Sequence, residues 1–248
     1  MRKQILFCAA LLLLSILSSV SVVAQDVIPQ PNNISYSKGY FTLNKGLKAV
    51  TNLTGQDFKV LNQFTSDDMD MPLISMKKPS KAYNVRLICT GTALQATQAQ
   101  DSARLQGYEL EVSPKSITIQ SLTPTGLFYG LLTLAQLEKG RQIPCVKVKD
   151  TPRFLYRGLM IDCSRHFWTK KFIMKQLDAM AYFKLNRFHW HLTDGGGWRM
   201  EVKQYPRLTN ETAYRTQSDW VKWWMEKDRK YCPVGTTGAY GGYYTQQD

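Results

Sequence analysis

The feature that most constrains the fold is a pair of short apolar runs on either side of a helical pattern. LYRGLMIDCS (155–164) and RFHWHLTD (187–194) each have the length and apolar character of a buried strand. Between them Thr169 can cap a helix. Strand, helix and strand in this order predict a βαβ unit with parallel strands. The apolar residues that would share one face of the helix are Phe172, Ile173, Leu177, Met180 and Ala181.

Polar and charged residues follow both predicted strands, whose bodies are apolar. The first strand ends in DCSRH (162–166), and the second ends in HLTDG (191–195). Because ligand sites gather at the carboxyl ends of parallel strands, we expect these two segments to form a site together.

His189 and His191 lie two residues apart in the second predicted strand, so they point to one face, and Phe188, Trp190 and Leu192 point to the other. Two such imidazoles could bind a divalent metal, as in metal-dependent amidohydrolases, but a catalytic zinc needs a third protein ligand. The only other histidine is His166. We therefore expect no metal or cofactor, and leave open whether the two rings pack internally or contact a ligand.

Asp194 is followed by three glycines, which let the backbone turn sharply and leave the carboxylate open at the strand end. The alternative is that Asp194 serves only as a turn residue. The glycines are not a phosphate loop, because the chain has no GxxxxGK[ST] pattern there and no helical pattern begins immediately after them.

The chain before about residue 150 has the pattern of a mixed α+β unit. YNVRLICTG (83–91) alternates like a strand, and GYELEVSPKSITIQS (107–121) is typical of a hairpin. TPTGLFYGLLTLAQLEKGR (123–141) carries leucines at helical spacing. This first part of the chain contains no cluster of acids, histidines or nucleophiles, so we interpret it as an accessory domain that ends near Pro152.

Residues 1–24 are predicted to be a secretory signal peptide. A basic start, an apolar run from Ile5 to Leu17 and small residues up to Ala24 predict cleavage before Gln25. The run is short for a membrane span of about 20 residues. We therefore expect a secreted or periplasmic protein with no membrane span after cleavage.

The composition is that of a globular protein, with 44% hydrophobic and 21% charged residues. The net charge of +13 comes from dispersed lysines, which favours a solvated surface over a nucleic-acid site. Beyond the leader the cysteines are widely spaced and form no CxxC pair, so disulfide pairing stays open. These cysteines are Cys89, Cys145, Cys163 and Cys232.

The segment RGLMIDCSRHFWTKKFIMKQLDAMAYFKLNRFHWHLTDGGGWRMEVKQYPRLT closely resembles the first two barrel strands of family 20 glycoside hydrolases, the β-N-acetylhexosaminidases. TGLFYGLLTLAQL and the strands before it resemble that family's small N-terminal domain. The resemblance implies an α+β N-terminal domain (25–150) followed by the start of a (β/α)8 TIM barrel (151–248), truncated after about two strands.

The resemblance also implies an activity and roles for individual residues. The family removes terminal N-acetylglucosamine or N-acetylgalactosamine from oligosaccharides and glycoconjugates. Arg165 matches the arginine that grips the 3- and 4-hydroxyls, and Asp194 matches the aspartate that supports a later histidine and, through it, the catalytic acid. We place His166 and His191 with Arg165 in the substrate-binding set. Gly195 and Gly196 stand where the family pattern has Asp and Gln.

The family's chemistry is substrate-assisted: the 2-acetamido oxygen attacks C1, while an adjacent Asp-Glu pair orients the acetamide and protonates the leaving oxygen. No Asp-Glu dipeptide occurs in the sequence. We therefore expect the pair to lie beyond Asp248, and the 248-residue chain alone to lack glycosidase activity.

Two alternatives to this enzyme stay open: a non-catalytic glycan-binding protein with the same fold, and a metal-dependent amidohydrolase. A separate choice concerns the tryptophans of DWVKWWM (219–225). Trp220, Trp223 and Trp224 share one helical face, which is typical either of a loop packed on its own scaffold or of a lid that stacks on sugars.

Overall fold

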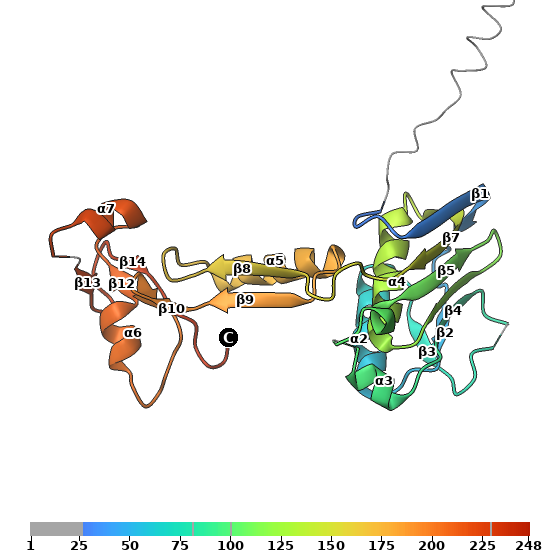
Figure 1. Cartoon of the computed structure of the whole chain (residues 1–248), viewed down its shortest axis with the longest axis horizontal. Coiled ribbons are helices and arrows are strands. Elements are labelled where there is room, and N and C mark those ends of the chain that lie inside the picture. The colour runs from blue at the N-terminus through green and yellow to red at the C-terminus, as the bar shows by residue number, and fades with distance from the viewer. Residues whose placement is uncertain (1–26, 81, 100, 229) are drawn as a thin grey trace, which may run out of the picture. The chain divides into compact units, whose positions relative to one another are not determined.

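The computed structural model describes residues 27–80, 82–99, 101–228 and 230–248. The predicted signal peptide, residues 1–24, lies outside the described residues. The chain divides into two compact units, the first running to Ala96 and again over Gly107–Thr151. The second comprises Thr97–Gln106 and Pro152–Asp248 (Figure 1).

A seven-stranded mixed sheet, in the order β1-β7-β5-β6-β4-β2-β3, forms the first unit. The predicted hairpin is present, with β5 and β6 antiparallel, and the strand predicted within 83–91 is β4. The strands are β1 (Asn33–Thr42), β2 (Ala49–Thr51), β3 (Leu73–Ser75), β4 (Val85–Cys89), β5 (Tyr108–Val112), β6 (Ile117–Ser121) and β7 (Gln142–Asp150).

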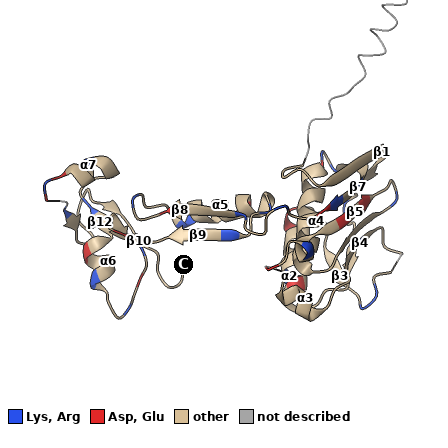
Figure 2. Ribbon diagram, in the orientation of Figure 1, with Lys and Arg blue, Asp and Glu red and all other residues tan. Residues whose placement is uncertain are grey.

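The two faces of this sheet differ in polarity because the strands alternate buried and exposed residues. The exposed positions of β5 and β7 pair across the strands: Lys147 lies 2.9 Å from Glu111, and Lys149 lies 2.7 Å from Glu109 (Figure 2). Because these ion pairs are solvent-exposed, they contribute little to stability and serve mainly to keep this face polar.

Helices cover the apolar face of the sheet (Figure 1). Helix α4 is the predicted leucine helix; Thr123 caps it by accepting a hydrogen bond from the Gly126 N–H at 3.2 Å. Gly130 lets α4 approach the sheet closely, since a Cβ there would lie 2.5 Å from Ile119. The helices that pack on the sheet are α2 (Gly55–Asp67) and α4 (Pro124–Leu137), while the short α3 (Ala93–Thr97) contributes no residue to the core.

The second unit begins with the predicted βαβ unit. Strands β8 (Gly158–Asp162) and β9 (Arg187–His191) are parallel, and α5 (Lys170–Tyr182) connects them. Thr169 caps α5 as predicted, accepting from the Phe172 N–H at 3.3 Å. One face of the strand pair is apolar and packs with α5 around a small buried cluster. The cluster contains Cys163, Ile173 and Tyr244, with Ile161, Phe167, Trp168, Phe172, Leu177, Phe188, Trp190 and Leu192 packed against it.

The rest of the second unit consists of short elements, all but one of which follow β9. Strands β10 and β11 form a hairpin, and β12 is the middle strand of a three-stranded sheet with β13 and β14. These elements are β10 (Thr193–Asp194), β11 (Gly197–Trp198), α6 (Arg207–Thr212), β12 (Tyr214–Arg215), α7 (Trp220–Met225), β13 (Tyr231–Cys232) and β14 (Tyr240–Gly241), together with the 3-10 turn η1 (Arg104–Gln106) of the same unit.

The described part of the chain also bears on disulfide pairing and on membrane-spanning helices. Its four cysteines are free thiols, of which three are buried and Cys89 is half-buried. Its helices are all too short or too polar to span a bilayer.

Removing a core side chain from α4 tests the packing of the first unit. Leu131 is fully buried, so Leu131→Ala is expected to lower the free energy of unfolding by about 2–5 kcal/mol. Denaturant titration followed by hydrogen exchange of the β5 and β6 amides measures this. Val60→Ala, at a residue of α2 that is 47% exposed, is the control and should change the value by less than about 0.5 kcal/mol.

Candidate active site

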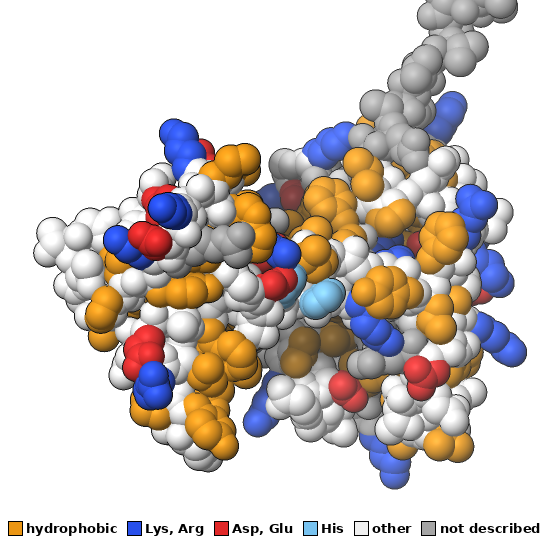
Figure 3. Space-filling model, turned by 60° about the vertical axis from the view of Figure 1, so that its left-hand side comes forward, with side chains coloured by type: hydrophobic (Ala, Val, Ile, Leu, Met, Phe, Trp, Pro, Cys, Tyr) orange, Lys and Arg blue, Asp and Glu red, His pale blue; other side chains and the backbone are white. Residues whose placement is uncertain are grey.

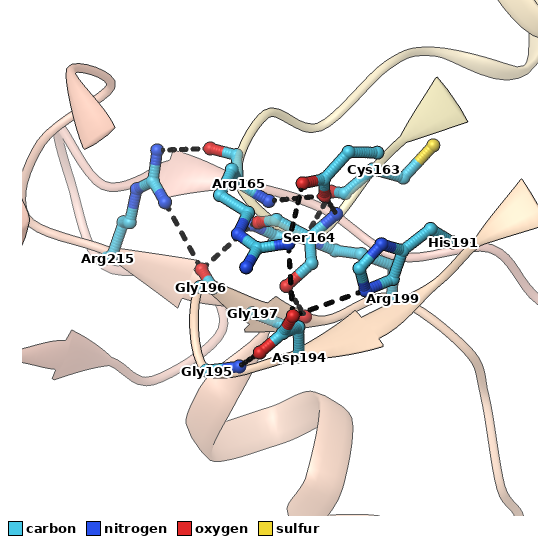
Figure 4. Close-up of polar contacts among 11 residues, drawn as sticks. Cys163, Ser164, Arg165, His191, Asp194, Gly195, Gly196, Gly197, Arg199 and Arg215 are labelled. Carbon is cyan, nitrogen blue, oxygen red and sulfur yellow. Dashed lines mark hydrogen bonds and ion pairs between the residues drawn. The ribbon is translucent and has the colours of Figure 1, made fainter. Parts of the chain in front are cut away.

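Asp162, the last residue of β8, organises the turn that follows it. Its Oδ1 accepts hydrogen bonds from the backbone N–H groups of Ser164 at 2.9 Å and Arg165 at 3.0 Å. Its Oδ2 lies 2.8 Å from Nη1 of Arg165. The turn therefore folds back, and the Arg165 guanidinium lies over the strand end rather than out in solvent (Figure 4).

Asp194 brings the second strand end to the same place. Its Oδ2 lies 3.0 Å from Nη1 of Arg165 and 3.3 Å from Nε2 of His191, while Oδ1 accepts from the Gly195 N–H at 2.6 Å (Figure 4). The predicted convergence of Arg165 and Asp194 is thus present in the structure. The sharp glycine turn is also present, as the connection between β10 and β11.

The Arg165 guanidinium is only partly used by these carboxylates. Both ion pairs are made by Nη1, and no described residue accepts a hydrogen bond from Nε or Nη2. The side chains of Arg165 and Asp194 are each 40% exposed. Two donor nitrogens of a planar fork, Nε and Nη2, therefore remain for a ligand with two adjacent acceptor oxygens.

The electrostatics of Asp162 reinforce this arrangement. Partial burial alone would raise the pKa of the Asp162 carboxyl, but the backbone and guanidinium hydrogen bonds of Arg165, with the charges of Arg165 and His191, bring the pKa below its ordinary value. Asp162 therefore stays ionised at neutral pH and keeps Arg165 in place.

Two buried arginines hold the loops that carry these residues. Arg199 is fully buried and donates to backbone carbonyls of Cys163 at 3.0 Å and Ser164 at 3.0 Å in the β8 turn. It also donates to the carbonyls of Gly196, Ala213 and Gly242. Burial, followed by the charge of Arg215, lowers the pKa of Arg199 to about 10, so it remains charged at neutral pH.

Arg215 is the second of these arginines and is also fully buried. It donates to the carbonyls of Arg165 at 2.7 Å and Gly196 at 3.2 Å, and so joins the two loops directly (Figure 4). Among the described residues neither buried arginine forms an ion pair with a carboxylate. The carbonyl dipoles of the loops therefore solvate both charges, which makes the loop geometry depend on the two side chains.

His166 lies outside the cluster of Arg165, Asp194 and His191. Its Nδ1 is 2.9 Å from the Tyr240 hydroxyl, and its ring lies 4.3 Å from that of Trp168, centroid to centroid. Partial burial, with the charges of Arg215 and Arg199, lowers the pKa of His166. Its predicted part in substrate binding stays a prediction.

His189 and His191 share a face of β9 as predicted, with ring centroids 6.1 Å apart. Among the described residues no group of three His, Cys, Asp or Glu side chains is placed to hold a metal ion. His189 is exposed, and histidine side chains reach the surface in the space-filling view (Figure 3). His191, half-buried and facing Asp194, is the member of the pair that joins the site.

The three tryptophans of α7 have different surroundings. Trp223 is buried, and its Nε1 donates to the Lys230 carbonyl at 3.1 Å, as a ring packed on its own scaffold should be. Trp224 is 45% exposed. Trp220 lies beside the site, with its ring centroid 5.8 Å from Cζ of Arg165.

Comparison with known proteins shows the family to which both units belong. Residues 24–151 match the description "Glycosyl hydrolase family 20, domain 2", and residues 154–248 match "Glycosyl hydrolase family 20, catalytic domain". The chain belongs to glycosyl hydrolase family 20.

Similar proteins carry consistent names. A β-hexosaminidase of Porphyromonas gingivalis is 32% identical over 90% of this chain and 27% of that protein. An N,N'-diacetylchitobiase of Vibrio harveyi is 34% identical over 91% of this chain and 25% of that protein. The chain therefore spans about a quarter of the length of these relatives.

A solved structure is also similar, that of a family 20 exo-β-N-acetylglucosaminidase from Vibrio harveyi in complex with N-acetylglucosamine. It has a TM-score of 0.68 and 29% identity, covering 90% of this chain and 33% of that one. Hexosaminidases of this family have an N-terminal domain and a TIM barrel, which agrees with the α+β unit and the parallel βαβ unit described above.

The sequence does not identify Arg199 or Arg215 as parts of the site, and it indicates for Asp162 a place at the strand end but no role. No spacing rule marks an arginine whose partners are carbonyls from distant segments. The position of Asp162, three residues before Arg165, was the available signal for its ion pair.

Replacing Arg199 tests whether it holds the loops. Because a lysine has three donors on one nitrogen and cannot reach the same carbonyls, Arg199→Lys is expected to cost about 3 kcal/mol or more of the free energy of unfolding. Chemical denaturation of the second unit, followed by hydrogen exchange, measures this. Arg207→Lys, at an exposed arginine paired with Glu211, is the matched control and should change little; an equal effect of both would contradict the role of Arg199.

His166 should titrate at a pKa below 6.5, its ordinary value. Since the folded pKa lies below the unfolded one, the unfolded chain binds more protons between the two values, and stability should fall as the pH drops through this window. Imidazole NMR signals, assigned with His166→Gln, measure the pKa. A value at or above 6.5 would contradict the combined effect of burial and of the neighbouring arginines on this ring.

Proposed function

We propose that these residues belong to an exo-β-N-acetylhexosaminidase and form the part of its site that holds the terminal N-acetylglucosamine or N-acetylgalactosamine. The observation that carries the proposal is Arg165, held by Asp162 and Asp194 through one nitrogen while Nε and Nη2 remain available. A pair of adjacent sugar hydroxyls matches two parallel donors of a guanidinium.

The two carboxylates give this binding end its geometry. Asp162 and Asp194 both contact Nη1, at 2.8 and 3.0 Å, so the guanidinium plane is set before a sugar arrives. Preorganised donors bind a hydroxyl pair with less loss of side-chain entropy than a free arginine would. In this proposal Asp194 supports the site, while His191 and His166 line it.

The reaction we infer is the retaining, substrate-assisted hydrolysis of the family, in which the sugar's own acetamido oxygen attacks C1. That chemistry requires an Asp-Glu pair, and the residues described here supply the hydroxyl-binding end of the site. The substrate is a glycan or glycoconjugate that ends in an N-acetylhexosamine, and the reaction needs no cofactor.

The proposal extends to the architecture of the protein and to its location in the cell. Strands β8 and β9 would be the first two strands of a (β/α)8 barrel preceded by the α+β domain, with limits at 25–150 and 151–248. Residues 1–24 would direct secretion or transport to a periplasm. Neither nucleic acid nor a membrane span belongs to this function.

Replacing Arg165 in the full-length protein tests the proposal. Arg165→Lys removes the fork while keeping the charge, and losing charge-assisted hydrogen bonds of about 1.5–3 kcal/mol each should lower kcat/KM on a chromogenic N-acetylglucosaminide by about 10²-fold or more. Arg207→Lys serves as the control and should leave kcat/KM unchanged.

Three results would separate the alternatives. An Arg165→Lys enzyme that keeps its wild-type kcat/KM would remove Arg165 from the binding site. A wild-type protein that binds N-acetylglucosamine without hydrolysing the glycoside would favour a non-catalytic glycan-binding protein. Activity that depends on added zinc and acts on amides would favour an amidohydrolase.

A further inference from the structure

The position of Trp220 is set by its own helix and by a buried arginine of β12. Asp219 caps α7 by accepting from the N–H groups of Val221 at 2.9 Å and Lys222 at 3.1 Å. The buried Trp223 anchors the helix, and its ring centroid lies 5.3 Å from that of Trp220. The Arg215 guanidinium also supports Trp220, with Cζ 5.6 Å from the ring centroid.

From this position the indole of Trp220 lies against both loops of the site. Its ring centroid is 5.8 Å from Cζ of Arg165, so the ring borders the guanidinium that carries the available donors. A Cβ placed on Gly196 would lie 2.8 Å from Cζ3 of the indole. The ring therefore occupies the space that a side chain at position 196 would take, and the glycine there is a requirement of this packing.

An aromatic ring beside a hydroxyl-binding guanidinium gives the site an apolar wall next to its hydrogen-bond donors. The guanidinium supplies hydrogen bonds in its own plane, and the face of the indole ring supplies an apolar surface with no N–H or oxygen to pair with a hydroxyl pointed at it. Two sugars that differ only in the direction of one hydroxyl near Arg165 would meet this surface differently. The cost of burying a hydroxyl without a partner is the physical basis of such discrimination.

We propose that Trp220 is a specificity-determining residue, which distinguishes N-acetylglucosamine from N-acetylgalactosamine through their opposite configurations at C4. This rests on the proposed function, in which Arg165 binds the 3- and 4-hydroxyls. Trp223 has a different part, since it is buried and holds α7 in place.

The test compares kcat/KM for the two epimeric chromogenic glycosides in the full-length protein. The ratio of the two values does not depend on how much of a preparation is folded, so a loss of folded protein leaves it unchanged. Trp220→Ala should change the ratio by about fivefold or more, and Trp220→Phe should stay close to wild type. Val221→Ala is the matched control on the same helix, because that side chain is 62% exposed.

Gly196→Ala approaches the same contact from the other side. Its Cβ would lie 2.8 Å from the indole, 3.0 Å from the Ser164 carbonyl oxygen and 3.2 Å from Cα of Arg165, so this variant disturbs the contact between the indole and the Arg165 loop and should also change the ratio. If Trp220→Ala does not fold, Gly196→Ala still tests the inference.

The outcomes separate this inference from the function on which it rests. A ratio that stays within about fivefold of wild type in both Trp220→Ala and Gly196→Ala, or an equal change in Val221→Ala, overturns the role of Trp220 while hydrolysis itself persists. A wild-type protein that hydrolyses neither epimer overturns the proposed function instead.

Discussion

The site depends on one buried guanidinium, that of Arg199, which binds backbone carbonyls from four separate segments. It contacts the turn after β8 through Cys163 and Ser164, and it contacts the glycine turn through Gly196. It also reaches the carbonyls at Ala213 and Gly242. A planar guanidinium with five donors can satisfy this many acceptors at once. Because the charge of Arg199 is buried, the loss of any of these hydrogen bonds would leave part of that charge unsolvated. The loops are therefore held as a single body.

The same type of side chain serves a different purpose at the strand ends. Arg199 and Arg215 have their donors turned inward to carbonyls, whereas Arg165 is 40% exposed and contacts its carboxylates through Nη1 alone. The carboxylates of Asp162 and Asp194 orient Arg165 without consuming its fork. The buried Arg199 and Arg215 thus make the loops rigid, and the partly exposed Arg165 is available to bind a ligand.

The tryptophans of helix α7 likewise differ in role, one being buried for packing and one lying beside the binding site. Trp223 contributes packing, and Trp220 lies where packing ends and the exposed guanidinium begins. Because Gly196 leaves room for the indole, a residue of the β10–β11 turn and a residue of a distant helix form one surface. The chemistry available to a sugar at this end is therefore shared between segments far apart in the chain.

Local patterns were sufficient to predict much of this protein. The alternation of β5 and β6, the leucine spacing of α4, the Thr169 cap and the apolar runs of β8 and β9 depend on neighbouring residues, so each was predictable from the sequence. The meeting of Arg165 and Asp194 was predictable as well, because parallel strands bring their carboxyl ends to one edge. The resemblance of SRHF and HWHLTD to family 20 likewise lies in consecutive residues, so it needs no knowledge of the fold.

By itself the sequence determined the strand β4, the hairpin of β5 and β6, the helices α4 and α5, the parallel pair β8 and β9, and the residues that end those two strands. Only the tertiary structure decided that Arg199 and Arg215 are buried against carbonyls, that His166 turns toward Tyr240, and that Trp220 covers Gly196. The reason is physical: these contacts join segments separated by many residues, through backbone carbonyls that every residue possesses and ring faces that no spacing rule identifies.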